Sequence, residues 1–453
     1  MKETINDIKN IFSRTVRRDF SGNTGIVIKN SIFQFLISIS TKIGSLLFTA
    51  IIARMLMPEL FGLYSLALSV ILIFSTLSEL GIGETIVRFV SKELGRDKKI
   101  TKAKDYTLYL GKLKLFLALG STSILMIAAN FISNIYYQKP IFLALIAGSL
   151  YILFLGISGF LKSVVLVSNY FNGLLYHEIA FQATRLVVVP LLIFLSLKKL
   201  ASTEVTLMFI IIGLSFSFLV PTLLLLFLSR KKVRYLAERG EKITSSEKRN
   251  TLKFIIPTAA TVITTIVFGS IDMVMLGKFV LSQYIGYYRA AYSLIAAIFP
   301  LISFSVVLLP TFSRLGEQQL EKGFKKSASI TFLLSLALLV FVFLFSPLII
   351  RLIYGNLYEP SINLLRVFSL LFISVPVMGV YVNYFTAKGK PFVVTKILIG
   401  VVILNILLNL LAIFLLRSYG DLAMVYGVTI ATILSSWAYT AGLALIKKRN
   451  SKV

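Results

Sequence analysis

The chain has 453 residues, of which 57% are hydrophobic and only 15% are charged, and its mean hydropathy is +0.88. A water-soluble domain of this length does not reach such values, so the composition excludes a soluble globular protein. The formal net charge of +28 is compatible with a nucleic-acid binder, and also with a membrane protein whose basic residues lie on one side. Cysteine is absent, which excludes disulfides and thiolate metal sites.

Residues 1–30 predict a basic amphipathic segment at a membrane surface. Ile5, Ile8, Phe12 and Val16 recur at helical spacing among lysines and arginines, as is typical of a helix that lies on an anionic lipid leaflet. The segment lacks a short apolar core with a small-residue cleavage site, so we expect an anchor and no removable signal peptide.

Twelve apolar stretches follow, each long enough to cross a hydrocarbon core of about 30 Å as a helix. Because these stretches are apolar on all faces and do not alternate, the expected fold class is an all-α polytopic membrane protein and not a β-barrel. The predicted spans lie near 31–53, 61–85, 107–129, 140–161, 178–197, 205–229, 251–277, 284–309, 327–350, 361–384, 393–415 and 422–445.

The segments between the predicted spans alternate in charge. About 32 lysines and arginines fall on the side of the N-terminus and about 7 on the other side. Because positive charge is enriched in cytoplasmic loops, both termini are expected in the cytoplasm. This orientation explains most of the net charge and removes the main reason to expect a nucleic-acid partner.

The polar segment 230–250 divides the spans into two sets of six. It contains no apolar run, so it predicts a cytoplasmic basic linker. The expected domains are an N-terminal six-helix bundle at 31–229 and a C-terminal six-helix bundle at 251–446, followed by a cytoplasmic tail at 447–453.

An internal repeat supports this division. The motif at Gly62-Leu63-Tyr64 aligns with Gly286-Tyr287-Tyr288 at an offset of about 224 residues, and the same offset pairs Arg54 with Lys278. Because each half has an even number of spans, the halves share one orientation, and a central cavity is expected between the two bundles.

Charged side chains within the spans are candidates for function, since each costs roughly 3 kcal/mol or more in hydrocarbon unless it faces a cavity or a partner. Lys42 lies near the middle of the first span, too deep for easy snorkelling. One polar stripe surrounds it, formed by Gln34, Ser38, Thr41 and Ser45.

The first span of the second half carries a similar stripe, formed by Thr258, Thr261, Thr265 and Asp272. We expect the two stripes to line opposite walls of one cavity. The alternative is that these small polar residues pack helix against helix, as they often do in membranes.

Several basic residues have two interpretations. Arg289 in the eighth span and Arg185 in the fifth are candidates for the cavity wall, or else they lie near an interface and reach lipid headgroups. Arg54 and Lys278 lie close to predicted span ends, which favours a role as snorkelling anchors. His177 is expected in a loop at the mouth of the fifth span.

Four carboxylates fall within the predicted spans and are candidates for binding a coupling proton or sodium ion: Glu79, Glu84, Glu178 and Asp272. For Glu79 and Glu84, the alternative is a cytoplasmic helix end paired with Arg88. The sequence has neither a glycine-rich phosphate loop nor a His-Glu-x-x-His motif, so we expect no cofactor, no metal and no enzymatic activity.

The turn between the first two predicted spans carries a familiar motif. It reads Ile52-Ala53-Arg54-Met55-Leu56-Met57-Pro58-Glu59-Leu60-Phe61-Gly62-Leu63-Tyr64 and is followed by Leu80-Gly81 and Arg88-Phe89-Val90. This pattern resembles the opening of the polysaccharide transporter family, the O-antigen-type flippases of the multidrug/oligosaccharidyl-lipid/polysaccharide exporter superfamily. Asn405-Ile406-Leu407-Leu408-Asn409 and Gly427 are similar to the family's late-span pattern, although Val428 replaces the usual small residue after the glycine.

The resemblance covers nearly the whole chain and implies two bundles that alternate between inward-open and outward-open V shapes. It implies a flippase for a polyprenyl-(pyro)phosphate-linked oligosaccharide in the plasma membrane of a prokaryote. The expected partners are this lipid-linked glycan, membrane lipids, and a glycan polymerase or glycosyltransferases, and the protein is expected to be a monomer. A cationic cavity suits such a substrate, because an anion crossing a low-dielectric region needs countercharge.

Two alternatives to a flippase remain. A multidrug or metabolite antiporter of the same superfamily usually carries cations, which a basic cavity disfavours. A membrane glycosyltransferase or polysaccharide polymerase typically needs a long outer loop, whereas every predicted outer loop is about ten residues or shorter.

Overall fold

The computed structural model describes residues 22–95, 100–238, 240–302, 308, 312 and 315–450. Across these residues the regular elements are all helices, which confirms the predicted all-α fold class. Most of the predicted basic segment at 1–30 and the last residues of the predicted tail lie outside the described residues.

The helices of the first half of the chain, which we call the N-lobe, are α2 (Gly22–Glu79), α3 (Ile82–Gly95), α4 (Ile100–Asn130), the π-helix η1 (Phe131–Tyr137), α5 (Phe142–Val167), α6 (Phe171–Lys198) and α7 (Thr203–Ser229). The short 3-10 helix η2 (Arg234–Leu236) follows. The C-lobe contains α8 (Ser245–Phe279), α9 (Ser282–Ile302), α11 (Glu317–Ile353), η3 (Asn356–Tyr358), α12 (Ser361–Phe368), η4 (Ser369–Ile373), α13 (Val375–Ala387), α14 (Pro391–Leu416), η5 (Arg417–Tyr419) and α15 (Asp421–Asn450).

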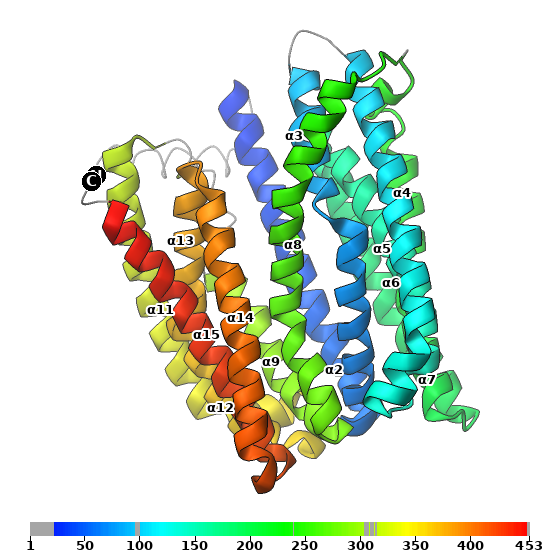
Figure 1. Ribbon diagram of the computed structural model, residues 1–453, viewed down its shortest axis with the longest axis vertical. Helices are drawn as coiled ribbons and strands as arrows, with labels where there is room; N and C mark the ends of the chain where they lie inside the picture. Colours follow the sequence, from blue (N-terminus) through cyan, green and yellow to red (C-terminus); the bar gives the residue numbers. More distant parts are fainter. Residues whose placement is uncertain are drawn as a thin grey trace.

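The long helix α2 is two helices joined at a sharp bend. Met57 has φ 58° and ψ 170°, and Pro58 after it has no amide hydrogen to donate, so the helix breaks and the chain turns back (Figure 1). Ten helices within the described ranges are long and apolar enough to cross a membrane. Because the segment Ile32–Gly95 passes twice and α9 adds a shorter helix, the architecture agrees with about twelve predicted spans.

The helices run between two ends of the molecule (Figure 1). The end that holds the start of α2, the connection from α7 to α8 and the end of α15 carries most of the lysines and arginines, and we call it the basic end. The opposite end holds the bend at Met57 and the short connections 138–141, 199–202 and 280–281, and we call it the kink end.

The lobes meet along α2, α8 and α9. Figure 1 shows α4 to α7 on one side of the molecule and α11 to α15 on the other, with α2 and α8 between them. The most extensive contact between the lobes joins α2 to α9. Helix α8 packs on α3 as well as on α14 and α15, so it belongs to both lobes.

The polar connection between the lobes is shorter than the predicted linker at 230–250. Helix α8 begins at Ser245 with a capping box, in which the Glu247 amide donates to Thr244 Oγ1 at 3.3 Å and the Thr244 amide donates to Glu247 Oε2 at 2.8 Å. Lys102 Nζ of α4 lies 2.9 Å from Glu247 Oε1. Residues 245–250 are therefore the first turns of a helix that is fastened to the N-lobe.

Candidate functional site

At the kink end, α2 and α9 cross backbone against backbone. A Cβ atom on Gly62 would collide with the carbonyl oxygen of Ser282, and one on Gly286 would collide with the carbonyl oxygen of Pro58. Only glycine fits at these two positions, because any side chain would force the helices apart. Gly62 and Gly286 are equivalent positions in the internal repeat, as are Pro58 and Ser282, so the crossing is reciprocal.

Basic side chains beside this crossing cap helix ends of the opposite lobe. Arg54 Nε donates to the carbonyl of Ile353 at 2.9 Å, and its Nη2 donates to that of Leu352 at the end of α11. Lys278, the repeat equivalent of Arg54, donates to the carbonyl of Tyr136 at the end of η1. Free carbonyls at a helix C-terminus carry partial negative charge and attract cations. Both residues were expected to snorkel into headgroups, and instead they join the lobes.

Lys139 forms a third cap, from the connection between η1 and α5. Its Nζ donates to the carbonyls of Gly277 and Val280 at 2.8 and 2.6 Å, at the C-terminus of α8. The Tyr137 hydroxyl also donates to the carbonyl of Val274 at 3.0 Å. The kink end is thus closed by a glycine crossing and by hydrogen bonds to main-chain carbonyls of the other lobe.

Lys42 and Arg289 line one cavity between the lobes, with a volume of about 130 Å³. Helix α2 contributes Lys42 and Ser45, and α9 contributes Arg289, Tyr292 and Ser293. A space of this size holds a small charged group with a few waters and excludes a whole oligosaccharide. We refer to it as the α2–α9 cavity.

Arg185 of α6 reaches the wall of this cavity. Its Nη2 donates to Ser45 Oγ at 3.0 Å, and its guanidinium lies 4.7 Å from the ring centroid of Phe48 and 5.1 Å from that of Phe181. In the described part of the chain, no carboxylate forms an ion pair with Lys42, Arg185 or Arg289. Two cations therefore line the cavity and a third contacts its wall through Ser45, and none of the three forms an ion pair among the described residues.

The rest of the predicted α2 stripe lies outside the cavity lining. The side chain of Gln34 is exposed, Ser38 Oγ donates to the carbonyl of Gln34 at 2.9 Å, and Thr41 Oγ1 donates to that of Ile37 at 2.8 Å. These hydroxyls are satisfied by their own helix. Of the predicted stripe, Lys42 and Ser45 alone appear among the lining residues of the α2–α9 cavity.

The stripe on α8 does not face the stripe on α2 across this cavity. Thr261 Oγ1 lies 2.8 Å from Thr395 Oγ1 of α14, and Thr265 Oγ1 donates to the carbonyl of Thr261 at 2.8 Å. Asp272 is turned into the interior of the C-lobe. The reason is the path of α8, which contacts α3 near the basic end and the C-lobe core near the kink end.

Asp272 is buried among neutral hydrogen-bond donors from three helices. Tyr288 Oη, Asn409 Nδ2 and Thr432 Oγ1 each donate to its carboxylate at 2.7 Å. Asn405 extends the cluster, since its Oδ1 lies 3.2 Å from Asn409 Nδ2. Sequence reasoning did not assign these partners, although two asparagines four residues apart in an otherwise apolar span were a usable signal.

The carboxylates of the N-lobe have other partners. Gln182 Nε2 donates to Glu178 Oε1 at 2.5 Å in the lobe interior, and Lys114 Nζ lies 2.6 Å from Glu79 Oε1. The suggested pairing of Glu79 with Arg88 was wrong, because Arg88 instead stacks on Phe254 with its Cζ 4.2 Å from the ring centroid.

The single histidine is buried in a helix, not placed in a loop. His177 lies in α6 with 1% of its surface exposed, and its Nε2 is 3.0 Å from Ser158 Oγ of α5. Neither residue lines the α2–α9 cavity. The prediction failed because the amphipathic first turns of α6 extend further than the apolar run that marked the span.

Comparison with family models matches residues 27–316 to a family described as "Polysaccharide biosynthesis protein". Comparison with curated protein sequences finds no match.

Several solved structures share the fold. The lipid II flippase MurJ in an inward closed conformation is 16% identical, with a TM-score of 0.66 over 91% of this chain and 86% of that one. A transporter from Pyrococcus furiosus, described by the reverse polarity of its binding pocket, is 17% identical, with a TM-score of 0.63 over 95% and 97% of the two chains. An inward-facing multidrug resistance MATE transporter is 14% identical, with a TM-score of 0.62 over 92% and 96%. At these identities, the likeness establishes the fold alone.

Proposed function

Because the chain belongs to the polysaccharide biosynthesis protein family, we propose that it carries a polyprenyl-(pyro)phosphate-linked oligosaccharide across the plasma membrane of a prokaryote. The observation that carries this proposal is that Lys42 and Arg289 line one cavity between the lobes, with Arg185 bonded to its wall at Ser45, and that none of the three forms an ion pair among the described residues. Positive charge without a carboxylate partner is costly inside a membrane, and an anionic substrate would offset that cost.

The α2–α9 cavity has room for only part of such a substrate. A phosphate or diphosphate would bind between Lys42 and Arg289, while the sugars extend into the space between the lobes and the polyprenyl chain stays in lipid. The same charges disfavour the cationic drugs of an antiporter. A glycosyltransferase or polymerase is disfavoured by the short connections at the kink end, 138–141, 199–202 and 280–281.

We infer that transport proceeds by alternating access, with the basic end in the cytoplasm. The kink end, closed by the α2–α9 crossing and the cationic caps, is then the outer gate. The substrate enters from the basic end, and opening of the kink end releases it. This cycle requires the Gly62 and Gly286 contacts to break and re-form once per transported molecule.

A translocation assay with purified protein in vesicles tests the substrate assignment. A fluorescent lipid-linked oligosaccharide is expected to move across the bilayer, and Lys42→Gln or Arg289→Gln is expected to slow it by about tenfold or more, since each removes one charge from the phosphate site. Lys198→Gln is the matched control, because Lys198 is exposed at the end of α6. Efflux of a fluorescent cationic drug with no movement of the glycan lipid would reject the proposal.

Asp272 is the best candidate for a coupling site. A buried carboxylate that has only neutral donors either holds a proton or accepts a cation, and its partners come from α9, α14 and α15. Asp272→Asn preserves the shape of the site and removes its charge. We expect this variant to lose the dependence of translocation on a proton or sodium gradient, measured by collapsing each gradient separately. If both gradients are irrelevant to the unmodified protein, coupling is absent.

A further inference from the structure

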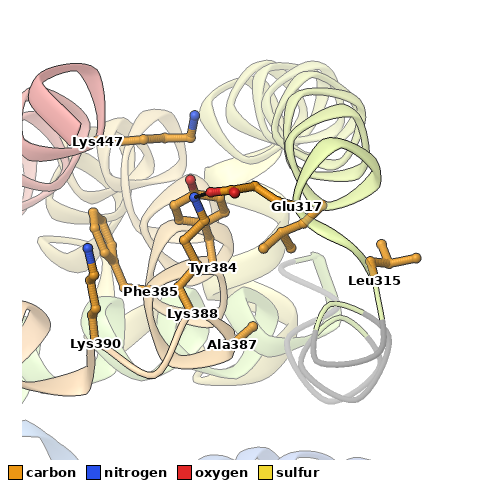
Figure 2. A pocket seen from close by; sticks show the side chains of 9 residues that line it. Leu315, Glu317, Tyr384, Phe385, Ala387, Lys388, Lys390 and Lys447 are labelled. Carbon is orange, nitrogen blue, oxygen red and sulfur yellow. Dashed lines mark hydrogen bonds and ion pairs between the residues drawn. The ribbon is translucent and has the colours of Figure 1, made fainter. Parts of the chain in front are cut away.

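A second cavity lies at the basic end of the C-lobe, apart from the α2–α9 cavity. Its volume is about 410 Å³, and it is enclosed by the start of α11, the connection from α13 to α14 and the end of α15 (Figure 2). The two cavities have no lining residue in common. Nothing in the proposed transport cycle uses this second cavity.

Three lysines from three different elements converge on this cavity. Lys388 follows α13, Lys390 precedes α14, and Lys447 lies in the last turn of α15. Figure 2 shows Lys390 and Lys447 on separate sides, with Tyr384 and Lys388 between them. Convergence of like charges on one concavity is unfavourable unless a negative group lies among them.

The protein's own carboxylates neutralise only part of this charge. Lys447 Nζ is 2.6 Å from Glu321 Oε2, and Lys388 Nζ is 3.0 Å from Glu317 Oε1 and 3.5 Å from Glu321 Oε1. Hydrogen bonds to Tyr384 and Glu317 raise the pKa of Lys388 above its usual value, so it is fully charged at neutral pH. Lys390 has no ion-pair partner among the described residues.

The surroundings add further positive charge. The first turns of α11 and the last turn of α15 also carry Lys322, Lys325, Lys326, Lys448 and Arg449. The side chain of Glu317 is 81% exposed, so it can move away from Lys388 at little cost when another anion arrives. When Glu317 moves away, Lys388 keeps its longer contact with Glu321, which also holds Lys447, so the cavity offers Lys390 and one side of Lys388 to an incoming anion.

The lining below the lysines is aromatic. Tyr384 and Phe385 lie one turn deeper in α13, and Lys447 Nζ is 5.0 Å from the ring centroid of Tyr384. A charged rim above an aromatic floor, at the level where membrane helices end, matches a phospholipid whose phosphate is at the surface and whose glycerol is just below it.

We propose that this cavity binds the phosphate of an anionic phospholipid headgroup, such as phosphatidylglycerol, through Lys388 and Lys390. The site lies within the C-lobe and shares no lining residue with the α2–α9 cavity. Free phosphate in solution offers the same chemistry, so the experiment has to separate the two sources.

Native mass spectrometry of the full-length protein in detergent tests the site. We expect a phosphatidylglycerol adduct that phosphatidylcholine does not form at equal concentration. Lys390→Gln is expected to weaken binding of this lipid roughly fivefold, because one lysine contact to an anionic headgroup is lost. The double variant with Lys388→Gln and Lys390→Gln is expected to weaken it roughly 25-fold, because two contacts are lost. Because Lys390 is exposed and unpaired, its replacement leaves folding intact.

Lys326→Gln is the matched control, since it removes an exposed positive charge from the same end of α11 outside the cavity lining. Equal loss of adduct in Lys326→Gln and Lys390→Gln would overturn the site in favour of diffuse surface attraction. Equal binding of the two lipids would also overturn it. Binding of millimolar inorganic phosphate that is lost in Lys390→Gln, with no phosphatidylglycerol adduct, would overturn the lipid and assign the site to a free anion. These readouts need no transport, so they stand or fall separately from the proposed function.

Discussion

The two ends of this molecule hold its lobes together in different ways. At the kink end, main chain meets main chain at Gly62 and Gly286, and cations of one lobe bind carbonyl oxygens of the other. At the basic end, α8 packs on α3 and α4 through long side chains, including the Phe89 and Phe254 rings at 5.9 Å and the ion pair of Lys102 with Glu247.

Under the proposed alternating-access cycle, the difference predicts which end acts as a gate with two discrete positions. A crossing of two glycines does not tolerate small displacements of its helices. A displacement either preserves the backbone contact or loses it entirely, because no side chain can follow the movement. Long side chains at the basic end can follow a displacement by changing rotamer. We therefore expect the closed-to-open ratio to change strongly when a side chain is enlarged at the kink end. We expect it to change weakly when a charge is removed at the basic end.

The largest effect is expected from Gly62→Leu or Gly286→Leu. Either side chain would collide with a backbone carbonyl of the other lobe, and overpacking of about 3 kcal/mol would lower the closed-to-open ratio at the kink end on the order of 100-fold. The measurement is a spin-label distance between Leu200→Cys and Leu357→Cys, exposed positions on the two lobes at this end. The chain has no cysteine of its own, so labels attach only there.

Gly120→Leu and Gly400→Leu are matched controls for these variants. A Cβ atom at either of these helical glycines meets nothing within 4 Å, so the same substitution should leave the label distance unchanged. If Gly62→Leu gave the same distance as Gly120→Leu, the crossing would not be the element that closes this end.

An intermediate effect is expected when the cationic caps are removed. Arg54→Gln and Lys139→Gln each delete an interaction with a helix C-terminus worth about 0.3–1 kcal/mol, so each should shift the closed-to-open ratio about two- to fivefold. The same pair of spin labels reports this shift. Lys199→Gln removes an exposed lysine at the same end and should have no effect. A shift as large as that of Gly62→Leu would mean that charge, not backbone contact, closes the gate.

The smallest effect is expected from Lys102→Gln at the basic end. Its ion pair with Glu247 is partly exposed, and such pairs contribute little to stability and weaken in salt. We expect a change of less than about fivefold in the closed-to-open ratio, fading at high ionic strength, together with a slightly lower thermal midpoint. A loss comparable to that of the glycine variants would contradict the distinction between the two ends.

The sequence predicted the spans and part of the candidate site. Apolar runs mark where helices cross lipid, but they do not show how far a helix continues into water, which is why Ser245 begins α8 inside the predicted linker. The cost of charge in hydrocarbon identified Lys42 and Arg289, and the structure brings both to one cavity. The role of these residues in binding a substrate stays a prediction.

Other features depend on packing that spacing cannot encode. Glu79 meets Lys114 only because α2 and α4 lie side by side, and Asp272 meets Asn409 and Thr432 only because α8 leans into the C-lobe near its end. Periodicity places a residue on a helix face, but the crossing angle of that helix decides what the face contacts.

The path of α8 has a mechanical consequence. Near Phe254, α8 packs on the N-lobe, and near Asp272 it packs in the C-lobe. When the lobes separate in the proposed cycle, a stiff α8 would have to lose its contacts with one lobe or bend between the two sets of contacts. Pro257 removes one hydrogen bond from the helix just after Phe254, so bending costs less than detachment, and we expect α8 to bend there if the lobes move as proposed.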